Sequence, residues 1–173
     1  MPSFSTRIVD IRSIARDTCA FDLSKPNGYP FDAGQHTALT LPLLDEDDEQ
    51  GRVRYFSFAS APSEDTLTVA TRLTGSGYKK TLAALTPDDE IGIDAPSGNL
   101  TLHSDTDRPA VFCVGGIGIT PARSIIRHVR RENTGHTLTL ITSNRTPDDA
   151  PFRDELRQES ENTPSFSLIE TLT

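Results

Sequence analysis

Alternation of apolar and polar residues marks the first hundred residues as rich in strands. The stretches 7–15 (RIVDIRSIA) and 66–73 (TLTVATRL) alternate as half-buried strands do. Two similar stretches at 36–43 and 53–60 predict further strands, and 78–85 (YKKTLAAL) has a helical pattern. Several short strands with one small helix indicate an antiparallel barrel.

The pattern changes after residue 106. Residues 110–114 (AVFCV) form an unbroken apolar run, which is typical of a parallel strand buried on both faces. A helical pattern at 120–132 follows, and then strand, helix and strand patterns at 137–144, 151–160 and 165–172. This alternation predicts a parallel α/β sheet. We therefore expect two domains, a barrel at 1–106 and an α/β domain at 107–173.

The segment 120–132 has one apolar stripe along the predicted helix. The stripe consists of residues spaced three or four apart: Ala122, Ile125, Ile126 and Val129. Thr120 suits the N-cap of this helix, and Pro121 suits its first helical position. The sequence therefore predicts that the helix begins at Pro121.

Three glycines, Gly115, Gly116 and Gly118, lie between the apolar run and this helix. Backbone N–H groups at a helix N-terminus lack partners and attract anions, and glycine allows a diphosphate to approach the backbone closely. A tight turn without a ligand would need only one glycine. Three glycines before Thr-Pro therefore favour phosphate binding, although the spacing differs from the G-x-G-x-x-G pattern of the commonest dehydrogenases.

Composition and charge narrow the functional classes. The formal net charge of −8 argues against binding to nucleic acid or to an anionic membrane, and no apolar run approaches the ~20 residues of a membrane span. No signal segment precedes the first strand, so we expect a cytoplasmic protein. The acidic stretch 45–51 is expected to be a solvated turn rather than a metal site.

The cysteines and histidines do not have the spacing of a metal site. Cys19 and Cys113 are far apart and flanked by apolar residues, so we expect two buried thiols. The histidines show no ligand spacing either; they are His36, His103, His128 and His136. We therefore expect no zinc or iron–sulfur centre in this chain.

Two polar stretches in the barrel half suit a second anionic ligand. Residues 54–62 contain Arg54, Phe56, Ser57 and Ser60, and residues 74–82 contain Ser76, Tyr78 and Lys79 at a helix start. Cationic side chains neutralise a diphosphate, hydroxyls bind a polar ring edge, and aromatic rings stack on it. Each residue taken alone has a simpler interpretation, in the core or on the surface.

Several stretches, in order along the chain, resemble the ferredoxin–NADP reductase family of flavin oxidoreductases. They are FDAGQHTALTL at 31–41, RYFSFAS at 54–60, SGYKKTL at 76–82, GIDAPSGNL at 92–100, GGIGITP at 115–121 and TSNRTPDDAPFRDEL at 142–156. The resemblance implies an antiparallel Greek-key barrel that binds FAD, followed by a partial parallel α/β domain that binds NAD(P)H. Departures include Tyr78 in place of Phe, Ala33 in place of Pro, Ala95 in place of Gly and Leu100 in place of Phe.

The resemblance also implies roles for individual residues. Arg54 would bind the flavin diphosphate, Phe56 would pack on the ribityl chain or the isoalloxazine, and Ser57 would hydrogen-bond flavin N5 as the catalytic residue. The other implied flavin contacts are Tyr55, Ser60, Thr71, Ser76, Tyr78 and Lys79. The implied nucleotide contacts are Gly115, Gly116, Gly118, Thr120, Pro121, Ser143, Asn144 and Arg145.

The implied function is an NAD(P)H-dependent flavin reductase. It would pass electrons to a separate acceptor, which is a ferredoxin, a cytochrome or a small molecule. The alternatives are a non-catalytic FAD-binding relay subunit and a nucleotide-binding protein without flavin. The arginines at 123, 127, 130 and 131 would either dock an acidic carrier or form a solvated helix face, and the solvated face is favoured.

Family members continue beyond the position at which this sequence stops. Two further strands and a Cys-Gly-Pro motif are expected there, whereas this sequence ends at SLIETLT. Without them, the crevice for the nicotinamide is incomplete, and the first strand of the parallel sheet is an exposed apolar edge open to self-association. A fragment and a natural short form are both compatible with the sequence.

Overall fold

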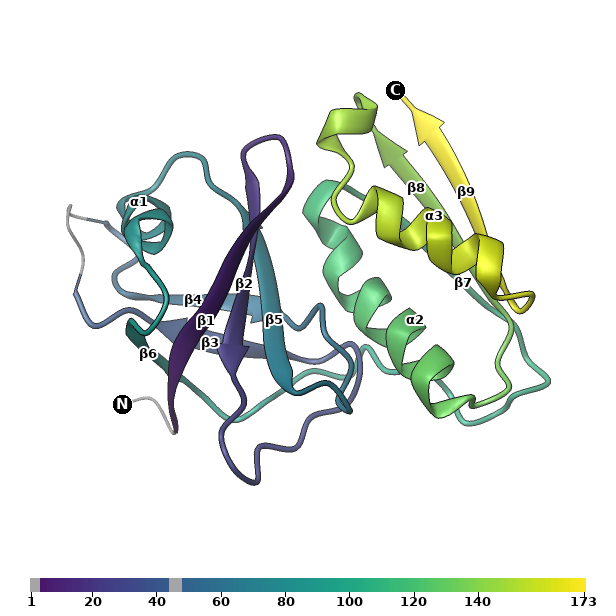
Figure 1. Ribbon diagram of the computed structural model, residues 1–173, viewed down its shortest axis with the longest axis horizontal. Helices are drawn as coiled ribbons and strands as arrows, with labels where there is room; N and C mark the ends of the chain where they lie inside the picture. Colours follow the sequence, from purple (N-terminus) through teal and green to yellow (C-terminus); the bar gives the residue numbers. More distant parts are fainter. Residues whose placement is uncertain (1–3, 44–47) are drawn as a thin grey trace.

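The computed structural model describes residues 4–43 and 48–173 and contains two sheets (Figure 1). Six strands form the first sheet: β1 (Phe4–Ala15), β2 (Thr18–Ser24), β3 (His36–Thr40), β4 (Val53–Ser57), β5 (Thr66–Arg72) and β6 (Glu90–Ile93). Their order is β4-β3-β6-β1-β2-β5 and every pairing is antiparallel. An antiparallel bridge between Phe58 and Val69 joins the two ends of the sheet, as in a barrel.

The barrel encloses its own hydrophobic core. Large side chains with little or no exposure fill it, among them Phe21, Leu39, Phe58, Leu67 and Tyr78. The helix α1 (Gly77–Ala84) packs its buried residues against this core. Sequence analysis predicted β1, β3, β4, β5 and α1, but it did not identify β2 or β6.

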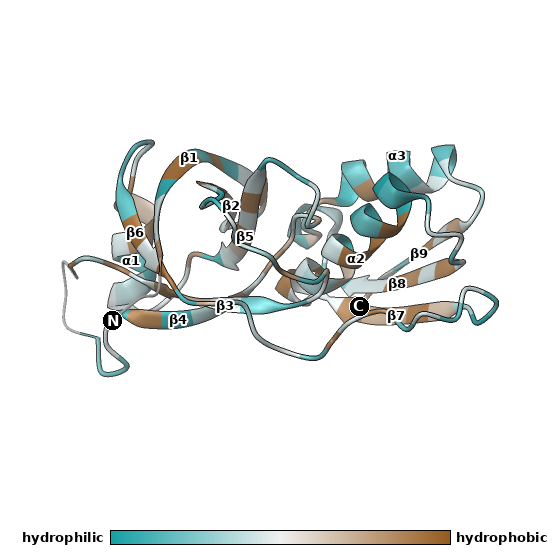
Figure 2. Ribbon diagram, turned by 90° about the horizontal axis from the view of Figure 1, so that it is seen from below, coloured by the Kyte–Doolittle hydropathy of each residue, from teal (hydrophilic) through white to brown (hydrophobic). Residues whose placement is uncertain are grey.

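The second sheet consists of three parallel strands, β7 (Ala110–Gly115), β8 (Leu138–Asn144) and β9 (Phe166–Leu172), in that order. The helices α2 (Ile119–Glu132) and α3 (Arg153–Asn162) lie on one face of this sheet (Figure 2). Two 3₁₀ turns, Gly116–Gly118 and Pro147–Asp149, precede the helices. A barrel followed by a parallel α/β sheet confirms the predicted fold class.

The change from antiparallel to parallel pairing falls between Ile93 and Ala110. The expected boundary at residue 106 lies within this connecting segment, and the division into domains at that residue stays a prediction.

Two predictions about β7 are wrong. Its side chains alternate between half-buried and exposed, and Val111 is 60% exposed, so the strand is not buried on both faces. Cys113 is exposed as well, and Cys19 is only partly buried. The reason is that α2 and α3 cover only one face of the sheet in the described part of the chain.

The start of α2 also differs from the prediction. The helix begins at Ile119, and its N-cap is Gly118, which provides no side-chain hydrogen bond. The Thr120 hydroxyl instead donates to the carbonyl of Ile117 at 3.2 Å. The 3₁₀ turn leads directly into the helix, so no side-chain cap is needed at Thr120. The predicted stripe of Ala122, Ile125, Ile126 and Val129 is buried and packs against the sheet.

Candidate functional site

The glycine turn between β7 and α2 needs two of its three glycines for structural reasons. A Cβ at Gly115 would lie 2.8 Å from the backbone oxygen of Ser143, and Gly116 has a φ of +50°. Gly118 has neither constraint: its φ is −60°, and no atom lies within 4 Å of a Cβ built there. Packing therefore explains Gly115 and backbone conformation explains Gly116, whereas folding alone does not explain Gly118.

The predicted residues after β8 lie beside this turn. Ser143 pairs with Gly115 in the sheet, and the Asn144 side-chain oxygen accepts a hydrogen bond from the backbone N–H of Gly116 at 2.9 Å. Arg145 lines the same groove as Gly116, and the groove has a volume of about 310 Å³. The structure therefore brings the two predicted parts of the nucleotide site together.

Two further arginines line this groove, and sequence analysis did not select them. Arg16 comes from the turn between β1 and β2, and Arg72 is the last residue of β5. Both belong to the barrel. Because they are far from the glycine turn in sequence, no pattern in the sequence linked them to it. With Arg145, they give the groove three cationic side chains, and Asp149, which also lines it, pairs with Arg16.

Thr120 and Pro121 lie within the first turn of α2. The Thr120 side chain is only 6% exposed and already donates to a backbone carbonyl. Its contribution to the turn is therefore structural in this conformation.

In the barrel, the predicted flavin residues converge where β4 meets the start of α1. The Arg54 guanidinium carbon lies 5.0 Å from the centre of the Tyr78 ring, and the rings of Phe56 and Tyr78 stack 6.1 Å apart. Ser76 is the N-cap of α1, and its hydroxyl accepts from the backbone N–H of Lys79 at 3.4 Å. Arg54 and the first turn of α1 thus place a guanidinium beside backbone N–H groups, as an anion site requires. In this conformation the guanidinium also donates to the backbone carbonyls of residues 50, 51 and 53.

A carboxylate already lies in this arrangement. Asp48 forms an ion pair with Arg54 and accepts backbone hydrogen bonds from Tyr78 at 2.9 Å and Gln50 at 3.0 Å. The hydrogen bond from the Tyr78 N–H, with those from Gln50, Ser76 and Arg54, lowers the pKa of Asp48 to about 2. Part of the acidic stretch expected as a solvated turn is thus a fixed anion; residues 45–47 lie outside the described residues.

The remaining predicted flavin residues differ in exposure. Ser57 ends β4 and is half-buried, and Tyr55 is 73% exposed. Ser60 is fully buried, and its hydroxyl accepts from the backbone N–H of Thr68 at 2.9 Å. The Tyr78 ring is also fully buried, with its hydroxyl donating to Leu39 O at 3.2 Å. The side chains of Ser60 and Tyr78 are therefore occupied within the protein.

Thr71 lies in β5 and is 6% exposed. It directly precedes Arg72, which lines the nucleotide groove. Thr71 therefore belongs to the strand that reaches this groove rather than to β4 or α1.

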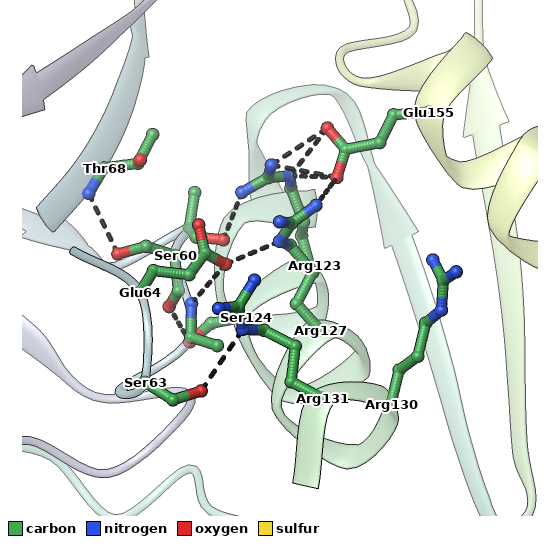
Figure 3. Close-up of polar contacts among 12 residues, drawn as sticks. Ser60, Ser63, Glu64, Thr68, Arg123, Ser124, Arg127, Arg130, Arg131 and Glu155 are labelled. Atoms are coloured by element: carbon green, nitrogen blue, oxygen red, sulfur yellow. Dashed lines mark hydrogen bonds and ion pairs between the residues drawn. The ribbon is translucent and has the colours of Figure 1, made fainter. Parts of the chain in front are cut away.

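Of the four arginines of α2, Arg130 and Arg131 are exposed to solvent as expected, whereas Arg123 and Arg127 are not. Arg123 is only 4% exposed, and its guanidinium donates to the Glu155 carboxylate at 2.9 and 3.0 Å and to the carbonyl of Ala59. Arg127 donates to Glu64 of the barrel and to Glu155 of α3 (Figure 3). Both expectations are therefore wrong for Arg123 and Arg127, because glutamates distant in sequence neutralise them.

The two outer arginines of the helix behave differently. Arg130 is paired with Glu159 of α3, and Arg131 donates to Ser63 at 3.3 Å on an exposed rim.

The described part of the chain has neither a metal-binding cluster nor a membrane-spanning helix. No group of three or more His, Cys, Asp or Glu side chains is placed to hold a metal ion there. None of the helices in residues 4–43 and 48–173 has the length and hydropathy of a membrane span.

Comparison with known proteins adds to this geometry. Residues 112–173 match the family described as oxidoreductase NAD-binding domain. Ferredoxin–NADP reductase B of Sorangium cellulosum is 30% identical over 158 residues, which cover 88% of this chain and 63% of the relative. The reductase component of propane 2-monooxygenase of Rhodococcus jostii is 26% identical over 174 residues, covering 97% and 45%.

A solved structure agrees with these relatives. A ferredoxin–NADP⁺ reductase from Neisseria gonorrhoeae with bound FAD and NADP superposes with a TM-score of 0.82 and 26% identity, covering 98% of this chain and 68% of that one. The chain spans about half to two thirds of the length of the relatives it matches. Residues 112–173 thus match the oxidoreductase NAD-binding domain, and the chain as a whole is similar in sequence and fold to ferredoxin–NADP reductase-like oxidoreductases.

Proposed function

We propose that this chain is an FAD-dependent oxidoreductase that takes electrons from NAD(P)H and passes them to a separate acceptor. The acceptor is a ferredoxin, a cytochrome or a small molecule. Relatives named as reductase components of oxygenases and as ferredoxin–NADP reductase support this function.

The barrel residues fit a flavin diphosphate. Arg54, the N-terminal N–H groups of α1 and Lys79 provide the positive potential that two phosphates need. The Asp48 carboxylate shows that an anion is accommodated there, since it receives a hydrogen bond from the Tyr78 N–H and an ion pair from Arg54.

The observation that carries the proposal is Gly118. Its backbone conformation suits any residue and its Cβ position is open, so nothing in the fold requires glycine. A ligand that lies against the backbone at this position explains the missing side chain. The N-terminus of α2 and the arginine-lined groove beside it suit the diphosphate of a nicotinamide nucleotide.

When bound, FAD would supply the ring that accepts a hydride from NAD(P)H and a proton from solvent, and that later releases two electrons to the acceptor. The resemblance of residues 54–60 to the family's flavin motif implies that Ser57 would hydrogen-bond flavin N5, and Ser57 lies half-buried at the end of β4. The remaining residues bind and orient: Arg54 and α1 at the flavin diphosphate, and the glycine turn at the nucleotide.

Purified protein tests this proposal. We expect a yellow protein, or a colourless one that FAD makes yellow, whose 450-nm absorbance is lost when NADPH or NADH is added without oxygen. A yellow protein that neither nucleotide bleaches would support a relay subunit without hydride transfer. A protein that FAD cannot reconstitute would contradict both functions.

We also propose that the protein acts in the cytoplasm and associates with a second copy through β7. This strand is an edge of its sheet among the described strands, and its Val111 side chain is largely exposed. Unpaired edge strands with apolar side chains pair readily with another chain.

A further inference from the structure

The end of the motif at residues 54–60 is hydrogen-bonded directly to the helix that follows the glycine turn. The Ser124 hydroxyl of α2 donates to the carbonyl of Ser60 at 2.6 Å, and it accepts from the backbone N–H of Gly34 at 3.3 Å. Ser124 has no exposed surface. Its one hydroxyl thus joins α2 to two separate loops of the barrel.

Arg123 makes the neighbouring connection. Its guanidinium donates to the carbonyl of Ala59 and, through two nitrogens, to the Glu155 carboxylate of α3. Its Cζ atom lies 4.4 Å from the centre of the Phe152 ring. This planar fork therefore contacts the barrel, α3 and an aromatic face at once, which a lysine ammonium does not reproduce.

The charges around this connection are balanced and largely shielded from water. Burial lowers the pKa of Arg123, and Glu155 opposes that effect. Burial raises the pKa of Glu155, but Arg123 and Arg127 outweigh it and hold the carboxyl below its ordinary value. Arg127 also pairs with Glu64, whose carboxylate accepts from the Ala61 N–H at 3.0 Å (Figure 3). The network is charged at neutral pH, and its directional hydrogen bonds fix both the orientation and the distance of α2 relative to the barrel.

These contacts lie between the residues of the two proposed ligand sites. Ala59 and Ser60 close the motif that begins at Arg54, and Ser57 lies two residues before Ala59. Arg123 and Ser124 lie in the first turns of α2, which begins one residue after Gly118. The network therefore connects the end of the motif that begins at Arg54 with the first turns of the helix that follows the glycine turn.

We propose that Arg123 and Ser124 are positioning residues, which hold the glycine turn at a fixed distance and angle from the flavin site and thereby set the rate of hydride transfer. This inference rests on the proposed function. Hydride transfer requires donor and acceptor atoms to be about 3–3.5 Å apart, and a displacement of about 1 Å costs up to about a hundredfold in rate. Neither residue needs to touch either ligand.

Two variants separate this role from folding. Arg123→Met removes the fork, and Ser124→Ala removes only one hydroxyl, so it serves if Arg123→Met does not fold. We expect the rate of flavin reduction at saturating NAD(P)H to fall at least about tenfold in the first variant and about threefold in the second. The dissociation constant of FAD should change by less than about threefold in both, because the residues at α1 are untouched. Arg131→Ala, on the exposed rim of the same helix, is the control and should retain the wild-type rate.

A second measurement does not depend on flavin chemistry. Spin labels on the native Cys113 and on a cysteine placed at the exposed Val9 of β1, with Cys19 replaced by serine, report the distance between the two sheets. We expect one narrow distance distribution in the parent and in Arg131→Ala. The distribution should be at least about twice as wide in Arg123→Met and Ser124→Ala, because lost tertiary contacts release local motion.

The outcomes are distinguishable. A slower rate together with a wider distribution supports the proposal. Folded variants that change only one of the two quantities, or only the thermal midpoint, overturn it. If the wild type binds FAD but NAD(P)H does not reduce it, the proposed function fails, and the distance distribution alone decides whether Arg123 and Ser124 fasten the two parts.

Discussion

Asp48 forms an ion pair with Arg54, the side chain that we expect to bind the flavin diphosphate. The same carboxylate accepts the Tyr78 N–H at 2.9 Å, at the start of α1. An anionic ligand that uses Arg54 therefore meets a competing negative charge within the protein.

Replacing this carboxylate should tighten FAD binding. Asp48→Asn keeps an acceptor for the Tyr78 N–H but removes the charge, so we expect the dissociation constant of FAD to fall about tenfold. Quenching of FAD fluorescence on titration of the apoprotein measures it. Glu49→Gln, an exposed neighbour, should leave the constant unchanged. Equal or weaker binding by Asp48→Asn would show that the carboxylate does not compete.

Acid stability provides an independent test of Asp48. Its pKa is lowered from an ordinary value of 3.8 to about 2, chiefly by the Tyr78 N–H, so the unfolded state binds more protons between these values. Its contribution to stability is therefore complete above about pH 4 and is lost as the pH falls towards 2. Chemical denaturation at several pH values should show a shallower decline in Asp48→Asn than in the wild type. Identical slopes would contradict the lowered pKa.

The glycine turn predicts opposite behaviour for two alanine variants. Gly118→Ala meets no neighbouring atom, so we expect unchanged stability or a gain of about 0.4–1 kcal/mol, with at least about tenfold weaker binding of NADP⁺ or ADP. Gly115→Ala would place a Cβ 2.8 Å from Ser143 O and should lose about 1–3 kcal/mol of stability. Thermal unfolding and calorimetry measure both effects. Unchanged nucleotide binding by Gly118→Ala would remove the main support for the nucleotide site.

Ser57 is expected to act on rate rather than on affinity. Ser57→Ala should reduce the rate of flavin reduction about tenfold, since a hydrogen bond contributes about 1–1.5 kcal/mol. Rapid-mixing absorbance at 450 nm measures this rate, and Ser63→Ala, in the loop contacted by Arg131, is the matched control. An unchanged rate would exclude the proposed contact with N5.

The exposed edge of the parallel sheet predicts concentration-dependent association. We expect sedimentation velocity at tens of micromolar protein to show a dimer, which Val111→Lys should convert to monomer because a charged edge resists pairing. Val9→Lys, on the exposed surface of the barrel, should leave the dimer intact. A wild-type chain that stays monomeric at these concentrations would exclude a second copy as the partner of β7.

The sequence predicted those elements whose signal is local. The stripe that includes Ile125 and Val129 identified α2, because helical spacing and burial coincide there. In contrast, β6 has four residues, including Gly92, which is too few for a periodic signal. The candidate residues of the two proposed anion sites were selected through ordered motifs, and their roles stay predictions.

The parts that were missed depend on contacts between distant segments. Arg123 looked like a surface charge, and only the position of Glu155 and of the Ala59 carbonyl shows why it is buried. The apolar run of β7 indicated a strand correctly, but it did not indicate how many of its faces the rest of the chain would cover.

Arg16, in the turn between β1 and β2, donates its backbone N–H to the carbonyl of Asp148 at 2.8 Å and pairs with the carboxylates of Asp148 and Asp149. The barrel and the parallel sheet are thus held together at two places, at this hairpin and along α2. The groove beside Gly116 lies next to the hairpin, since Arg16 lines it. Full separation of the two parts would have to break both sets of contacts, whereas loss of one set widens their relative motion. The groove is consequently a slot of set width, and a nucleotide would enter from its open side without the two halves closing over it.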